Sequence, residues 1–287
     1  MKSIRRKTLL YKSGVEYADY GLNHVEGCSH GCNFPCYAFM IKKRCGVVKT
    51  YQEWVQPKIV ENALELLDAE LPRLKDKIKC VFLCFMTDPF MYKQPEITDL
   101  TLKILVRLQQ DNVKSTVISK GIYPKELLDK LTYGENNDYG STIVSLSEDY
   151  RKGFEPGSAP IKDRIKALKR LHNDGLKTWV SMEPYPTPNI VKQDIMEILK
   201  AVSFVDKIVF GKWNYNKTIS EQSSSKSFYN SMVGYVIDFC NKRGIEYHIK
   251  DGTISKDCLF EEKANKDQID FYIKSTQSAS SSKAMLV

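Results

Sequence analysis

The segment Glu26-Gly-Cys-Ser-His-Gly-Cys-Asn-Phe-Pro-Cys-Tyr-Ala38 places three cysteines in one short stretch of chain: Cys28, Cys32 and Cys36. It directly follows a candidate strand near 20–25, so we expect it to form the loop at that strand's carboxyl end. Two glycines and a proline in the segment allow the chain to coil. Three thiolates in such a loop can converge on a single inorganic centre.

Three interpretations of these cysteines stay open. A structural zinc site requires a fourth ligand, which Cys45 or His30 could supply. Three unrelated buried cysteines are a simpler interpretation, but the polar, glycine-containing loop disfavours it. An iron–sulfur cluster with three protein ligands leaves one iron open for a further ligand. The pattern favours the cluster.

Short apolar runs follow the cysteine segment at regular intervals. Most are rich in β-branched or aromatic residues, as buried strands are. They cover 80–86, 113–119, 141–147, 176–182, 207–211 and 245–249. Segments of helical period lie between them, at 57–75, 95–110, 124–131, 160–173, 189–201 and 227–243.

Strands that alternate with helices predict βαβ units and a parallel sheet. With the strand near 20–25 there are about six or seven strands. We therefore predict an α/β fold, a partial (β/α)6-type TIM barrel in a single domain, with a doubly wound open sheet as the alternative. Either fold would bind ligands at the carboxyl ends of the strands.

Composition narrows the class of protein. The 287 residues are 42% hydrophobic, and no apolar run reaches the roughly 18 residues of a membrane span. The basic N-terminus precedes an apolar stretch too short for a signal peptide, so we expect a cytoplasmic protein. A formal charge of +8 suits a nucleic-acid partner, but it also suits an ordinary lysine-rich protein.

The cysteine segment resembles the signature of the radical S-adenosylmethionine superfamily, which is normally Cys-x3-Cys-x2-Cys; here one extra residue precedes Cys36. Other stretches resemble the spore photoproduct lyase-like branch, in the same order along the chain. These are Thr87-Asp-Pro-Phe90, Ile118-Ser-Lys120, Ser145–Ser147 and Phe154-Glu-Pro-Gly-Ser-Ala-Pro-Ile-Lys-Asp-Arg164. The likeness covers roughly 20–188.

The resemblance implies a [4Fe–4S] cluster on Cys28, Cys32 and Cys36, with S-adenosylmethionine on its open iron. An electron from a flavodoxin or ferredoxin would cleave the cofactor to a 5′-deoxyadenosyl radical, which abstracts hydrogen from a substrate. By the same likeness, polar groups at the strand ends would bind the cofactor. Thr87 and Asp88 would meet its ammonium, Lys120 and Arg164 its carboxylate, Ser145 or Ser147 its ribose, and Tyr37 is a further candidate.

The same branch implies two further expectations, a hydrogen-donating cysteine and a nucleic-acid or nucleotide substrate. Cys84 lies near the expected place but one position away, which on a strand would turn it to the opposite face, so a packed core thiol competes with catalysis. The segment Gly211–Asn216 is a candidate substrate surface or a hydrophobic lid.

Two other classes of function stay open. One is a nucleic-acid-binding module stabilised by zinc, and the other is an iron–sulfur scaffold or electron carrier without catalysis. For domains, we predict the partial barrel over 1–255, with the cluster loop at 26–45. A polar, low-complexity C-terminal extension would follow at 256–287.

Overall fold

The computed structural model describes residues 1–14, 16–33, 36–220 and 224–255. Its contacts divide the chain into two compact units, Met1–Val180 (unit 1) and Ser181–Val287 (unit 2). Strand β9 (Lys177–Tyr185) runs across the boundary. The predicted domain bounds stay a prediction, and the extension at 256–287 lies outside the described residues.

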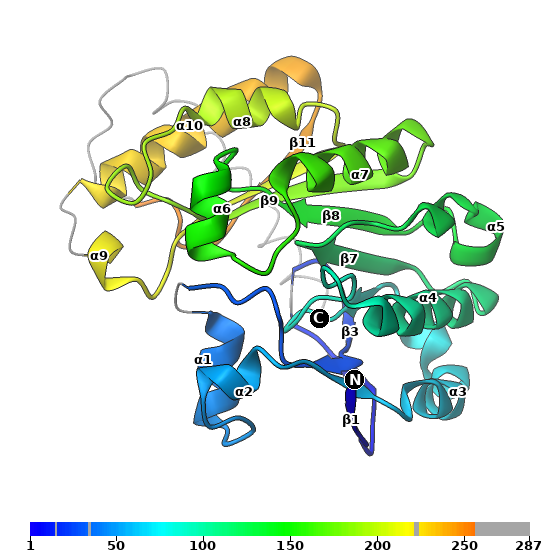
Figure 1. Cartoon of the computed structure of the whole chain (residues 1–287). Coiled ribbons are helices and arrows are strands. Elements are labelled where there is room, and N and C mark those ends of the chain that lie inside the picture. The colour runs from blue at the N-terminus through cyan, green and yellow to red at the C-terminus, as the bar shows by residue number, and fades with distance from the viewer. Residues whose placement is uncertain (15, 34–35, 221–223, 256–287) are drawn as a thin grey trace, which may run out of the picture. The chain divides into compact units, whose positions relative to one another are not determined.

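Unit 1 contains the predicted parallel sheet (Figure 1). Its strand order is β8-β7-β6-β3-β2, and only the β2–β3 pair is antiparallel. The bounds are β2 (Leu10–Lys12), β3 (Tyr20–Leu22), β6 (Val81–Leu83), β7 (Ser115–Ser119) and β8 (Asp138–Thr142). The sheet is open, and the predicted α/β class with mostly parallel strands, as in a partial barrel, is confirmed.

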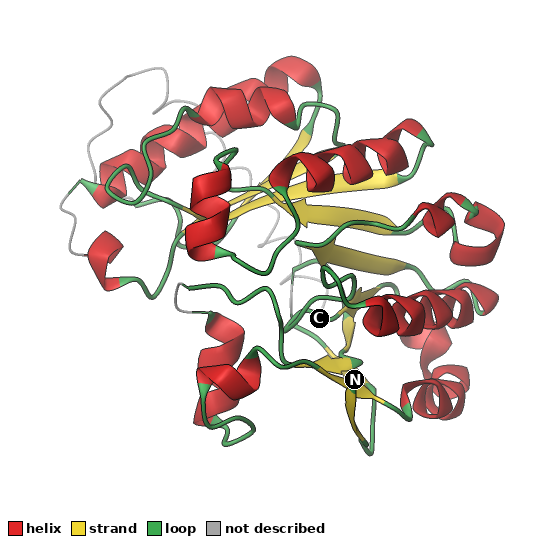
Figure 2. Ribbon diagram, in the orientation of Figure 1, coloured by secondary structure: helices red, strands yellow, loops and turns green. Residues whose placement is uncertain are grey.

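Helices join these strands in the manner of βαβ units, as Figure 2 shows by colour. Helix α4 packs beside α3 and α5, and α7 packs beside β8. The helices are α1 (Tyr37–Arg44), α2 (Tyr51–Trp54), α3 (Ala63–Leu74), η1 (Lys75–Lys77), α4 (Pro95–Gln110), η2 (Lys125–Leu128), α5 (Lys130–Tyr133), α6 (Glu148–Phe154) and α7 (Ile161–Asn173). The core between sheet and helices holds fully buried side chains such as Phe82, Ile104 and Leu168.

A second, three-stranded sheet in unit 1 corrects one sequence prediction. It consists of β1 (Lys2–Ile4), β5 (Lys58–Val60) and β4 (Val25–Glu26), in that order. The helix predicted over 57–75 therefore starts only at Ala63, because Ile59 and Val60 extend to pair with β1. The short β5 also pairs with β4, directly before the cysteine segment.

The strand predicted at 141–147 is also displaced, since β8 ends at Thr142. The polar stretch after it turns, and Ser147 caps helix α6 by accepting a hydrogen bond from the amide of Tyr150. The sequence pattern did not predict α6, because its seven residues are too few for a periodic signal.

Unit 2 continues the alternation of strands and helices. Strand β10 (Lys207–Lys212) pairs in parallel with β11 (Glu246–Ile249). Its helices are α8 (Ile195–Ala201), α9 (Lys217–Ser220) and α10 (Ser225–Arg243). In the part of the chain that the structure describes, no helix is long and apolar enough to cross a membrane.

A close approach of two backbone segments fixes the cysteine segment to the loop after helix α6. The amide of Gly157 donates to the carbonyl oxygen of His30 at 2.9 Å. A Cβ atom at Gly157 would lie only 2.0 Å from the carbonyl oxygen of Ser29. Only glycine permits this approach without displacement of one backbone.

We therefore expect Gly157→Ala to destabilise unit 1 by about 1–3 kcal/mol, the usual cost of overpacking. Gly153→Ala is the control, because a Cβ at Gly153 would meet nothing within 4 Å. That helical site should lose no stability and gain about 0.5–1 kcal/mol. Urea unfolding followed by circular dichroism measures both. Equal stability of the two variants would contradict the close approach of the Gly157 backbone to Ser29 and His30.

Candidate functional site

The cysteine segment leads from strand β4 of the three-stranded sheet into helix α1. Cys28 follows β4, and Cys36 directly precedes α1. The loop is held by its backbone: the Cys28 amide donates to the Trp54 carbonyl at 2.8 Å, and the Cys32 carbonyl accepts from the Tyr51 hydroxyl at 2.7 Å.

The three thiols lie near one another, since their charges interact. Burial raises the pKa of Cys28 well above its usual range, and a charge on Cys32 raises it further. Burial also raises the pKa of Cys32 to about 12, against the lowering effect of the Lys120 ammonium. Without metal, these two thiols are therefore protonated at neutral pH, and a bound metal centre must displace their protons.

The donor set fits a centre with three protein ligands. The sequence offered two candidates for a fourth ligand. One of them, Cys45, is exposed at the end of α1. His30, the second, is buried with both ring nitrogens engaged: Nε2 lies 2.7 Å from Asp88 Oδ2, and Nδ1 lies 3.4 Å from the Gly157 carbonyl oxygen. Among the described residues, no group of three or more His, Cys, Asp or Glu side chains is placed to hold a single metal ion.

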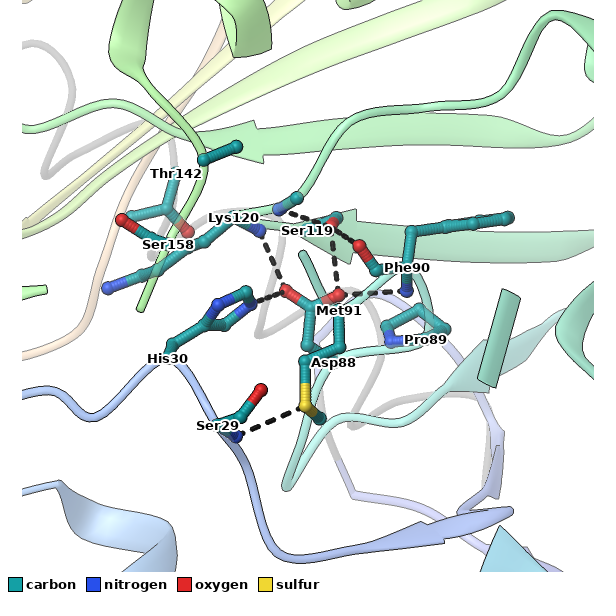
Figure 3. A network of polar contacts seen from close by, with 12 residues as sticks. Ser29, His30, Asp88, Pro89, Phe90, Met91, Ser119, Lys120, Thr142 and Ser158 are labelled. Atoms are coloured by element: carbon teal, nitrogen blue, oxygen red, sulfur yellow. Dashed lines mark hydrogen bonds and ion pairs between the residues drawn. The ribbon is translucent and has the colours of Figure 1, made fainter. Parts of the chain in front are cut away.

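Asp88 joins three segments of the site (Figure 3). Its Oδ2 accepts from the Lys120 amide at 2.7 Å and contacts His30. Its Oδ1 accepts from the Phe90 amide and the Ser119 hydroxyl, both at 2.8 Å. Burial alone would raise the pKa of Asp88, but His30 and these donors lower it below its usual value.

Four contacts use the ordinary hydrogen-bonding capacity of a carboxylate. The observed partners of Asp88 therefore assign it a positioning role. It fixes the cysteine segment against the ends of β6 and β7. The predicted contact of Asp88 with a cofactor ammonium stays a prediction.

Lys120 brings a positive charge to the cysteines. It follows β7 directly, and its Nζ lies 3.7 Å from Cys32 Sγ and 2.6 Å from Glu155 Oε1. Burial alone would lower the pKa of Lys120, but the charge that Cys32 carries when it is ionised and the negative charge of Glu155 raise it above its usual value. The ammonium is therefore charged at neutral pH.

Glu155 is the acidic member of a buried ion triad with Lys120 and Arg164. Its Oε2 accepts from Arg164 Nη2 at 2.9 Å, and its side chain is 3% exposed. Burial would raise the pKa of Glu155, but the two cations lower it to about 2. The sequence motif contained Glu155, but we did not predict a role for it. A basic residue directly after β7, a basic residue in α7 and one acid between them in the sequence are the signal that could have indicated it.

Arg164 is held inside the protein. Its guanidinium also donates to the carbonyls of Ala159 and Thr142, at 2.8 and 3.0 Å, and to the Ser158 hydroxyl at 2.8 Å. The structure thus brings Arg164 and Lys120 together through Glu155. A direct contact of Arg164 with a cofactor stays a prediction.

Thr87 and Tyr37 lie at the border of the site. The Thr87 hydroxyl donates to the Val25 carbonyl at 3.4 Å, next to the cysteine segment. The Tyr37 hydroxyl donates to the Phe85 carbonyl. Both residues therefore tie the segment to the loop after β6, and their predicted contacts with a cofactor stay predictions.

Ser145, Ser147 and Cys84 have contacts within the protein, and their predicted roles in cofactor binding and hydrogen donation stay predictions. The buried Ser145 hydroxyl accepts from the Ser147 amide at 3.1 Å, and Ser147 caps α6. Cys84 is fully buried in an apolar cluster, with its Sγ 3.4 Å from His24 Nδ1. That placement agrees with the alternative of a packed core thiol.

Two curated relatives resemble the chain in sequence. It is 27% identical over 199 residues to uncharacterized protein ORF301 of Acidianus two-tailed virus, a match that covers 66% of this chain and 64% of the relative. It is 25% identical over 181 residues to uncharacterized protein MJ0683 of Methanocaldococcus jannaschii, over 63% of this chain and 66% of the relative. The chain thus spans slightly less than two thirds of each relative.

The structure is similar to solved structures of spore photoproduct lyase. A variant with bound dinucleoside spore photoproduct matches with a TM-score of 0.64 at 13% identity, over 86% of this chain and 81% of that one. A variant with bound AdoMet and the same dinucleoside matches with a TM-score of 0.61 at 13% identity, over 86% and 80%. At this identity the likeness shows the fold.

The sequence also matches a family model directly. The model of the Radical SAM superfamily matches residues 22–202, more than half of the chain and nearly all of the residues that build the site. The chain belongs to the radical SAM superfamily.

Proposed function

We propose that the chain is a radical S-adenosylmethionine enzyme whose iron–sulfur cluster is held by Cys28, Cys32 and Cys36. The observation that carries the proposal is the ion triad beside these cysteines. Lys120 and Arg164 bring two positive charges and Glu155 one negative charge, so the triad has one positive charge in excess. The Lys120 ammonium lies 3.7 Å from Cys32 Sγ, so an anionic centre on the cysteine thiolates would meet a fixed positive charge there.

The protein's own groups have distinct tasks in this proposal. The three thiols give up their protons to bind the cluster. Asp88 holds the backbone of Lys120 and the ring of His30, so it sets the distance between β7 and the cysteine segment. Glu155 keeps the Lys120 ammonium beside Cys32, where that cation can also pair with the carboxylate of a bound cofactor. When bound, the reduced [4Fe–4S] cluster supplies the electron that splits S-adenosylmethionine into methionine and a 5′-deoxyadenosyl radical.

The reductant and the substrate are part of the same proposal. A flavodoxin or ferredoxin would deliver the electron. A nucleic acid or nucleotide is the substrate class that we favour, because of the net charge of +8 and the shared fold with a lyase that binds a dinucleoside. Since fold alone does not define chemistry, the experiments below treat cluster, cofactor and substrate separately.

The cluster assignment predicts the metal content of cysteine variants. Anaerobically reconstituted protein should hold about four irons per chain, and Cys→Ala at 28, 32 or 36 should abolish the cluster. Cys45→Ala is the matched control and should retain it, because Cys45 is exposed at the far end of α1. Iron, sulfide and zinc analyses measure this. Stoichiometric zinc without iron, or loss of the centre in Cys45→Ala, would contradict a three-cysteine cluster.

Lys120→Ala should weaken the binding of S-adenosylmethionine by roughly 1.5–3 kcal/mol, the range for hydrogen bonds to charged groups. Iron content should stay unchanged. Lys114→Ala is the control, because Lys114 precedes the same strand at its opposite end and pairs with Asp138. Equilibrium binding to the reconstituted protein measures both affinities. Equal affinities in wild type and Lys120→Ala would remove Lys120 from the cofactor site.

The substrate proposal predicts a steep dependence of binding on salt. If several phosphates are neutralised, the logarithm of the DNA or RNA association constant should fall with a slope near −0.7 to −0.9 per contact against the logarithm of salt. The bound nucleic acid should also raise 5′-deoxyadenosine formation. Absence of binding at low salt, or binding without that increase, would direct the search to small metabolites.

A further inference from the structure

Helix α6 borders the cysteine segment. The backbone amide of Asn33, next to Cys32, donates to the Phe154 carbonyl at 2.8 Å. The Asn33 side-chain amide donates to the Gly153 carbonyl at 2.9 Å. Glu155, the residue after α6, belongs to the ion triad. The carboxyl end of α6 therefore contacts the cysteine segment and continues directly into the charged part of the site.

Tyr150 on this helix has an unexplained hydroxyl group. The residue is only 5% exposed, and its ring stacks on Phe154 with 4.8 Å between ring centroids. Within 1–14, 16–33, 36–220 and 224–255, the buried hydroxyl has no hydrogen-bond partner. An unbonded buried hydroxyl costs roughly 1–3 kcal/mol, so native proteins rarely leave one without a protein, water or ligand partner.

The surroundings of Tyr150 identify what kind of partner is missing. Burial raises the pKa of the phenol above its usual value, the negative charge of Glu155 raises it further, and the Lys120 ammonium acts in the opposite direction. The hydroxyl is therefore protonated at neutral pH and can donate. Glu155 is not the acceptor, because the Tyr150 hydroxyl makes no hydrogen bond to any of the described residues.

We infer that Tyr150 is a further residue of the cofactor site, whose hydroxyl donates a hydrogen bond to an anionic acceptor beside Cys32 and Lys120. Two sources share this chemistry: a sulfur of the iron–sulfur cluster, and the carboxylate of S-adenosylmethionine. The inference rests on the proposed function and adds to it a group that the sequence motifs did not include. In chemical terms, Tyr150 binds and tunes the anion, while Lys120 neutralises it.

Tyr150→Phe tests the inference, because it removes the hydroxyl and keeps the ring. Tyr139→Phe is the matched control: Tyr139 is also buried in unit 1 and its hydroxyl likewise has no hydrogen-bond partner among the described residues, but it lies near the amino end of β8. Both variants should take up iron like the wild type. The measurements are the midpoint potential of the cluster without S-adenosylmethionine, and the dissociation constant of S-adenosylmethionine with the cluster present.

Each source predicts its own result. A hydrogen bond to a cluster sulfur favours the reduced state, so its loss should shift the potential of Tyr150→Phe to a more negative value. A hydrogen bond to the carboxylate should leave the potential unchanged and weaken cofactor binding roughly tenfold or more.

If Tyr150→Phe matches Tyr139→Phe in both quantities, the hydroxyl meets only a water molecule and the inference is wrong. Failure of the wild type to take up iron is a different outcome. It would overturn the proposed function, and the assignment of Tyr150 with it.

Discussion

A buried carboxylate must be hydrogen bonded, and Asp88 meets this requirement with groups from three separate segments. His30 comes from the cysteine segment, Phe90 from the loop after β6, and Ser119 and Lys120 from the end of β7. Loss of any of these donors would leave a charge partly unsatisfied at 3% exposure, which costs more than the bond contributes when it is formed. Asp88 therefore fixes the relative positions of the strand ends more strictly than apolar packing would.

The ion triad depends on that arrangement. The Asp88 carboxylate holds the backbone of Lys120, while Glu155 holds its side chain at 2.6 Å. Buried ion pairs contribute little net stability, because desolvation offsets their attraction. Their effect here is to orient a side chain: they hold the Lys120 ammonium at a fixed position beside Cys32. A low-dielectric site strengthens the effect of such a fixed charge on any anion that binds there.

The sequence predicted the parts of this site that depend on local pattern. The cysteine segment follows β4, and Lys120 follows β7, because apolar runs end in polar residues at those points. The placement of Asp88 and Arg164 in the same unit followed from the family motifs. Local pattern could not show that Glu155 lies between Lys120 and Arg164, or that His30 pairs with Asp88. The contacts of Glu155 with Lys120 and of His30 with Asp88 join residues that are far apart in sequence, and only tertiary packing selects them.

The displaced strand at 141–147 and the helix that was not predicted have the same physical origin. The alternation of apolar residues in 141–147 favoured a strand, but Ser147 gains more as a helix cap, and β8 moves toward the amino end. The segment after β8 instead forms α6, whose carboxyl end contacts the cysteine segment and leads directly to Glu155. A short capped helix leaves almost no periodic signal, so its contribution to the site becomes visible only in three dimensions. In this protein a local sequence motif identifies the cysteines, whereas the residues around them are positioned by helix capping and burial, which the local pattern does not reveal.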